Sequence, residues 1–172
     1  MKLVEIWVKA PLLKDASLLL AGECVQAIYP ELFKKFSKGR VVLTNCPEAE
    51  GSVSMGKLAS IVTCSAPKEI TVLTVEGSPH CYTLHAAVNE ALFVANSDLK
   101  CRHFVIVDGR PLEVSPESVR LGRYLHLSQK CIDENPKILD ELAKFSLEHR
   151  KSLKKRPAIS GKKIKGWQRD IP

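Results

Sequence analysis

Long apolar runs are absent from this chain of 172 residues. A membrane-spanning helix needs roughly 18 or more consecutive apolar residues, and no stretch of the chain approaches that length. Residues 1–11 alternate around Glu5 and lack the continuous apolar core and cleavage site of a signal peptide. These absences predict a cytoplasmic protein that contains no membrane segment. The chain also shows no internal repeat.

Closely spaced cysteine pairs are absent as well, although the chain contains six cysteines. Without a CxxC motif there is no local signature of a zinc ribbon or a thioredoxin-like pair. In a reducing compartment, six cysteines indicate free thiols, metal ligands or core residues more often than a disulfide framework. Any metal site must therefore be assembled by the fold from cysteines that are distant in sequence.

The net charge of +7 is confined to one end of the chain. Residues 1–136 carry 15 basic and 15 acidic residues, whereas residues 137–172 carry 11 basic and 4 acidic residues. This division predicts an α/β domain over residues 1–136, followed by an amphipathic helix and a basic tail over residues 137–172. A basic tail is typical of segments that bind acidic partners or nucleic acid, but a solvated terminus is the simpler interpretation and nucleic acid is not favoured.

Hydrophobic periodicity alternates between strand and helix along the chain. Strands are predicted at residues 2–9, 17–21, 40–44, 69–75 and 103–108, and helices at residues 24–36, 57–65, 82–96 and 136–150. Pro30 should kink or start the first helix, and residues 108–111 should form a turn around a glycine. Strands that alternate with helices predict a three-layer α/β sandwich with a mostly parallel central sheet and helices on both faces, followed by the C-terminal helix and basic tail.

Three of the cysteines follow predicted strands directly. Cys24, Cys46 and Cys81 each come after an apolar strand and before a helix. The carboxyl ends of parallel strands meet at one edge of a sheet, where open α/β folds bind ligands. Three thiols at that edge predict a zinc or iron–sulfur site, with His80 as the candidate fourth ligand. Buried core cysteines are the alternative, as is a redox pair of thiolates near helix N-termini.

Other candidate residues have simpler interpretations. The segment 51–57 (GSVSMGK) matches most of a phosphate-binding loop, but Leu58 stands where that loop needs Ser or Thr, and a surface loop is expected. His85 could orient a ligand or act as a general base, although a partly exposed helix residue is the commoner case. Cys64, Cys101 and Cys131 are expected in a helix, at a strand start and in a loop, as structural residues.

The segments ECVQAIYPELFKKFSKGRVVLTNCPEAE and KEITVLTVEGSPHCYTLHAAVNEAL carry a resemblance. Residues 17–108 resemble an α/β domain attached to small ferredoxin-like 4Fe-4S proteins, in which similar cysteines recur in the same order as Cys24, Cys46 and Cys81. The resemblance implies a ferredoxin-like or redox-enzyme partner. The chain lacks the family's CxxCxxCxxxCP segment, and His80 precedes Cys81 where the family has a cysteine pair, which favours a Cys₃His site.

The sequence therefore predicts a metal- or iron–sulfur-binding domain with a redox or accessory role and a protein partner. Two alternatives stay open. A zinc-dependent hydrolase or lyase would keep one metal position open for an activated water. A metal-free interaction module would bind through the basic tail.

Overall fold

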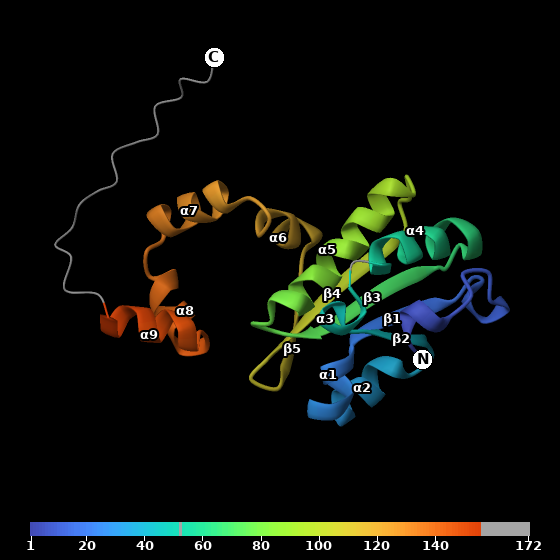
Figure 1. The fold of residues 1–172 in the computed structure, drawn as a ribbon, viewed down its shortest axis with the longest axis horizontal. Helices are drawn as coiled ribbons and strands as arrows, with labels where there is room; N and C mark the ends of the chain where they lie inside the picture. Colours follow the sequence, from blue (N-terminus) through green and yellow to red (C-terminus); the bar gives the residue numbers. More distant parts are fainter. Residues whose placement is uncertain (52, 156–172) are drawn as a thin grey trace, which may run out of the picture. The chain divides into compact units, whose positions relative to one another are not determined.

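A five-stranded sheet forms the centre of the fold in the computed structural model, which describes residues 1–51 and 53–155 (Figure 1). The strands are β1 (Ser17–Gly22), β2 (Val41–Asn45), β3 (Glu69–Val75), β4 (Lys100–Val107) and β5 (Arg110–Val114). Their spatial order is β2-β1-β3-β4-β5. The first four strands are parallel, and β5 returns antiparallel to β4. The predicted mostly parallel sheet is confirmed.

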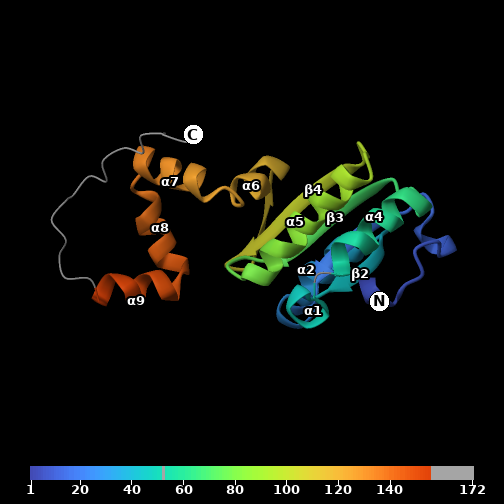
Figure 2. The ribbon, with the colours of Figure 1, turned by 45° about the horizontal axis from the view of Figure 1, so that its top comes forward.

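Helices cover both faces of the sheet (Figures 1 and 2). The helices of the α/β fold are α1 (Glu23–Ile28), α2 (Pro30–Ser37), α3 (Pro47–Glu50), α4 (Val53–Ser65), α5 (Pro79–Val94) and α6 (Pro116–Leu121). One face packs Leu18, Leu20 and Val72 against α4 and α5, and the other packs Leu19 and Leu73 against α1 and α2. The side-chain period of two along each strand separates these two cores. This arrangement confirms the three-layer sandwich.

The strand order reverses between β1 and β3. From β1 the chain passes to β2 on one side, and then crosses back to β3 on the other side. Gly22 pairs with Asn45 of β2, and Ala21 pairs with Leu73 of β3. In open α/β sheets, a crevice for ligands opens at the carboxyl ends of strands where the order reverses. The three segments that follow β1, β2 and β3 therefore surround one crevice.

The predicted break at Pro30 is confirmed. Tyr29 separates α1 from α2 with φ −130° and ψ 61°, outside the helical region. Proline lacks an N–H group and restricts the residue before it, so it starts a new helix more readily than it continues one. Close to the Tyr29 ring, Asp108 and Gly109 take positive φ in the turn between β4 and β5. The turn was predicted, but the antiparallel strand after it was not.

The predicted strand over residues 2–9 is wrong. The segment forms the short 3₁₀ helix η1 (Leu3–Glu5), and a second one, η2 (Pro11–Leu13), follows. Leu3, Ile6 and Leu13 are buried in the core on the α4 side. Only Lys2 makes a β-bridge, to Thr44. The segment therefore covers β2 by inserting side chains rather than by pairing its backbone.

Two other predictions need correction. Residues 53–57 belong to α4 and are not a surface loop, because Ser54 and Leu58 begin a buried helical face that continues to Ile61 and Val62. The single predicted helix over residues 136–150 is divided into α8 (Ile138–Phe145) and α9 (Leu147–Lys155) by Ser146, which takes an extended conformation.

The chain divides into two compact units, one over residues 1–130 and one from Cys131 onward. Helix α7 (Leu125–Glu134) crosses this boundary, and α8 and α9 belong to the second unit. Most of the predicted basic tail, residues 156–172, lies outside the described residues. Over the described ranges, no helix combines the length and the apolar character needed to cross a membrane.

Thr71, in the middle of β3, offers a test of this packing. The residue is 1 % exposed, and its hydroxyl has no hydrogen-bond partner. An unpartnered buried hydroxyl costs free energy that a methyl group does not. We expect Thr71→Val to leave the free energy of unfolding unchanged or to raise it by about 1 kcal/mol, measured by urea denaturation. Thr71→Ser, which keeps the hydroxyl and loses the methyl group, should lower it; a destabilised valine variant would contradict this packing.

Candidate functional site

The three cysteines that follow β1, β2 and β3 lie at the carboxyl edge of the sheet, next to the order reversal. Cys24 lies in the first turn of α1, Cys46 immediately precedes α3, and Cys81 lies in the first turn of α5. A Cβ atom built on Gly22, at the end of β1, would lie 3.7 Å from the Cys81 sulfur and 3.8 Å from Thr74 Cγ2. The thiol of Cys81 and the side chain of Thr74 thus both border the end of β1.

The environment of Cys81 connects the three thiols. Burial raises the pKa of the Cys81 thiol, and negative charge on Cys24 and on Cys46 raises it further. Hydrogen bonds from the Ser78 hydroxyl and the Val75 backbone partly offset this rise. Cys81 is therefore a protonated thiol at neutral pH.

His80 faces a carboxylate. Its Nδ1 lies 3.3 Å from an oxygen of Glu48, a residue of α3. A ring nitrogen held by a carboxylate orients the imidazole and leaves Nε2 as the nitrogen for a ligand. The sequence analysis named His80 but not Glu48, which shares no motif with it.

The other cysteines are not part of this crevice. Cys64 is exposed on α4, and Cys131 is exposed on α7 rather than in the predicted loop. Cys101 lies near the start of β4, as predicted, and burial raises its pKa to about 12. In the part of the chain that the structure describes, no group of three or more His, Cys, Asp or Glu side chains stands ready to hold a metal ion.

A chain of hydrogen bonds lies beside the crevice, between the sheet and α5. Thr74 Oγ1 is 2.8 Å from His85 Nε2, and His85 Nδ1 is 2.9 Å from His103 Nδ1. His103 Nε2 is 3.1 Å from Asn89 Oδ1, and the Asn89 amide donates to the carbonyl oxygen of Pro116 over 3.3 Å. All four side chains belong to residues that are at most 7 % exposed. His85 is therefore buried. The partly exposed position that its place in the helix predicted is wrong.

The two histidines are neutral. Burial, together with the neighbouring His103, lowers the pKa of His85 to about 3. Burial and the positive charge of Arg120, partly offset by Glu117, lower the pKa of His103 to about 4. A neutral imidazole carries one proton, so each ring donates one hydrogen bond and accepts one.

The protons along the chain can then be assigned. The carbonyl oxygen of Pro116 can only accept, so Asn89 turns its amide nitrogen to Pro116 and its oxygen to His103. His103 must donate from Nε2, and its Nδ1 accepts from the Nδ1–H of His85. The Nε2 of His85 accepts in turn from the Thr74 hydroxyl. Each group in the chain donates toward Pro116 and accepts from the side of Thr74. The Thr74 hydroxyl therefore donates its hydrogen to His85.

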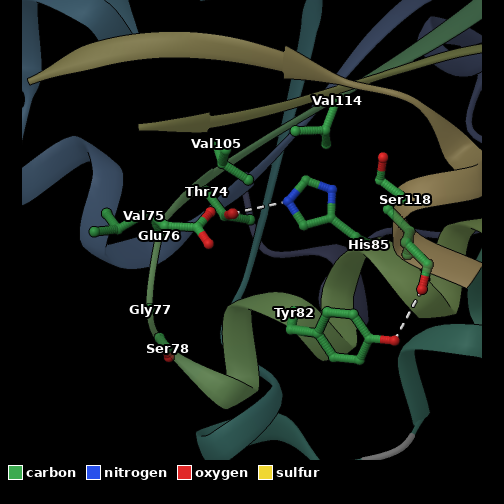
Figure 3. Close-up of a pocket in the computed structure, with 11 residues that line it drawn as sticks. Thr74, Val75, Glu76, Gly77, Ser78, Tyr82, His85, Val105, Val114 and Ser118 are labelled. Atoms are coloured by element: carbon green, nitrogen blue, oxygen red, sulfur yellow. Dashed lines mark hydrogen bonds between the residues drawn. The ribbon is translucent and has the colours of Figure 1, made fainter. Parts of the chain in front are cut away.

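A pocket of about 170 Å³ opens where this chain meets the crevice (Figure 3). Figure 3 shows the imidazole of His85 in the pocket, with Val105 and Val114 on one side and Tyr82 on the other. The pocket is lined by Thr74, Val75, Glu76, Gly77, Ser78, Tyr82, His85, Val105, Val114, Ser118 and Val119. Its geometry, with Thr74 bonded to His85 and His85 to His103, is that of a nucleophile, a base and an orienting group. A histidine with a pKa of about 3 is nevertheless a weak base, so the arrangement positions Thr74 rather than activating it.

Strand-end spacing points to the cysteines, whereas the hydrogen-bonded chain has almost no signature in the sequence. One signal was present: His85 and Asn89 are four residues apart and so share one face of the predicted helix. Thr74 and His103 lie on strands that are neighbours in space, and no spacing along the sequence could reveal that pairing. His103 had no companion in sequence that singled it out.

A family model for a Rossmann-like domain matches residues 10–160 of the chain. No curated protein and no solved structure matches the chain significantly. The match agrees with the mostly parallel sheet and its flanking helices. It extends beyond residue 136, the predicted end of the α/β domain, and it gives no support for an attached ferredoxin-like 4Fe-4S protein.

The buried histidines predict how stability depends on pH. Both have an ordinary pKa of 6.5 when unfolded and a lower one when folded, so protonation favours the unfolded chain. Their stabilisation is complete above about pH 6.5 and is lost as the pH falls toward about 4. We expect the free energy of unfolding to drop by up to about 1.4 kcal/mol per pH unit for each histidine, measured by urea denaturation at pH values from 6.5 to about 5, where carboxylates stay ionised.

His126, exposed on α7, provides the control. Replacing it by glutamine should leave the pH slope unchanged, whereas His103→Gln should reduce the slope by about half, because one of two coupled protonation sites is removed. A wild-type stability that stays constant over this range would contradict the assignment of two buried neutral histidines.

Proposed function

The chain belongs to the family of Rossmann-like domains, and from that premise we propose that its crevice binds a soft metal ion or an iron–sulfur cluster through Cys24, Cys46 and Cys81. Ligands of this class of fold bind where the strand order reverses, and here the segments at that point supply thiols. Thiolates favour zinc and iron–sulfur clusters over hard cations such as magnesium.

One observation carries the proposal: Cys24, Cys46 and Cys81 each lie where a parallel strand ends and a helix begins. The three strands β1, β2 and β3 are neighbours in the sheet, so the three thiols follow adjacent strand ends. The proposal requires their side chains to turn toward a common ion. Cys24 is exposed in the first turn of α1, so the surrounding atoms leave room for this rotation.

His80 fits the role of the fourth ligand. It precedes Cys81 in the first turn of α5, and Glu48 holds its Nδ1. Histidines that bind metal ions commonly use one ring nitrogen while a carboxylate holds the other. With Nε2 as the ligating atom, the donor set would be three sulfurs and one nitrogen, which suits tetrahedral zinc.

We propose that the bound group serves electron transfer or an accessory step for a partner. The resemblance of residues 17–108 to domains attached to ferredoxin-like proteins favours a ferredoxin-like protein or a redox enzyme as that partner. Free thiols of this kind persist in reducing compartments, so we place the protein in the cytoplasm.

Metal analysis tests the proposal. The full chain, purified without oxygen, should contain zinc or iron in near-stoichiometric amount, and an iron–sulfur cluster would add visible absorption. Cys46→Ala should lose the metal, because a ligand is removed. Cys64→Ala is the matched control, since Cys64 is exposed on α4 and outside the crevice. Glu48→Gln should weaken binding by about tenfold, the usual scale for an orienting carboxylate.

The outcome that contradicts the proposal is equally definite. A wild-type protein that contains no metal and takes up neither zinc nor reconstituted iron and sulfide would leave the three cysteines as packing residues. Equal metal loss in Cys46→Ala and Cys64→Ala would point to unfolding instead of ligand removal, and circular dichroism of both variants separates these cases.

Proton release gives a second test. Burial keeps Cys81 protonated at neutral pH, so zinc must displace its proton in order to bind. Calorimetric zinc titration in buffers of different ionisation enthalpy should show release of protons, with an affinity that falls as the pH is lowered. Cys81→Ser should release about one proton fewer. Zinc binding without proton release would exclude Cys81 as a ligand.

A further inference from the structure

Two side-chain protons around the pocket in Figure 3 are donated to protein acceptors. The Thr74 hydroxyl donates to His85, and the Tyr82 hydroxyl donates to the carbonyl oxygen of Val119 over 2.9 Å. The Ser78 hydroxyl oxygen accepts from the backbone N–H of Cys81 over 3.4 Å. Each of these three hydroxyl oxygens keeps a lone pair that can accept a further hydrogen bond.

Thr74 and Tyr82 therefore present hydrogen-bond acceptors, and not donors, to a ligand in the pocket. Ser78 and Ser118 keep a choice; Ser118 lies 3.4 Å from the Ser115 hydroxyl, and either oxygen can donate. Among the described residues that line the pocket, Glu76 alone carries a charge, and its carboxylate also accepts.

The remaining walls are apolar. Val75, Val105, Val114 and Val119 line the pocket together with the aromatic ring of Tyr82. An apolar cavity of about 150 Å³ accommodates a molecule of the size of benzene, and this pocket has about 170 Å³. Glu76, Tyr82 and Ser118 are exposed, so the pocket is open to solvent.

We infer that this pocket binds a small organic amine, with its ammonium group at Thr74 and Glu76 and its apolar body against the valines and Tyr82. A charged donor makes stronger hydrogen bonds than a neutral one. The carboxylate of Glu76 attracts the ammonium group, and the committed Thr74 proton leaves the hydroxyl oxygen free to accept from it. The histidine chain fixes this orientation of the hydroxyl.

Three probes of nearly the same shape test the inference: benzylammonium, benzyl alcohol and benzoate. Calorimetric titration of the full chain should show that benzylammonium binds at least about tenfold more tightly than benzyl alcohol, because its donor is charged. Benzoate should not bind. Backbone amide shifts in nuclear magnetic resonance spectra should change for residues 74–78 and for Val119.

Two variants locate the ammonium group. Thr74→Val removes the acceptor while keeping the side-chain shape, and Glu76→Gln removes the exposed charge without disturbing a buried group. Each should weaken benzylammonium binding by about tenfold. Thr71→Val is the matched control, because Thr71 lies on the same strand and faces the other core. If Thr74→Val fails to fold, Glu76→Gln still decides the question.

Three results would overturn the inference: benzoate binding as tightly as the amine, equal affinity for the amine and the alcohol, or unchanged amine binding in Glu76→Gln. The test is independent of the proposed metal site. Cys46→Ala should lose the metal and still bind benzylammonium as the wild type does. A wild-type protein that takes up no metal and binds the amine would refute the proposed function and leave this inference intact.

Discussion

The reversal of strand order between β1 and β3 is the constraint on which the rest of this molecule depends. Because β2 and β3 flank β1 on opposite sides, the chain must leave the sheet in two directions at one edge. The segments after the three strands then surround a common space, and each begins a helix. The strand order alone produces a crevice of this kind, whatever the side chains are. The three cysteines lie at this crevice, and the proposed amine pocket lies next to it.

The buried histidine pair provides hydrogen-bond partners for polar groups that the packing of α5 on the sheet removes from water. Polar side chains under α5 are removed from water, and an unpartnered one would cost about 1–3 kcal/mol. A continuous chain from Thr74 to Pro116 satisfies each donor and acceptor, provided that both rings stay neutral. The same chain orients the Thr74 hydroxyl at the pocket. Stability and ligand orientation thus share one set of hydrogen bonds, which links the electrostatics of the core to the chemistry of the surface.

Sequence patterns predicted the parallel strands and the strand-end placement of Cys24, Cys46 and Cys81, because both follow from local periodicity. They failed where tertiary packing decided the outcome. The N-terminal segment alternates like a strand, yet Leu3 and Ile6 gain more by entering the core than by pairing. The pairing of His85 with His103 depends on which strand lies beside β3, and a single sequence does not encode that neighbour in any local pattern.

The central claim is that three thiols from three strand ends bind one ion. X-ray absorption spectroscopy at the zinc edge of the zinc-loaded full chain measures this most directly, because it counts the atoms around the metal. The account predicts three sulfur neighbours at about 2.3 Å and one nitrogen at about 2.0 Å. A shell made only of nitrogen and oxygen atoms, with no sulfur contribution, would contradict it.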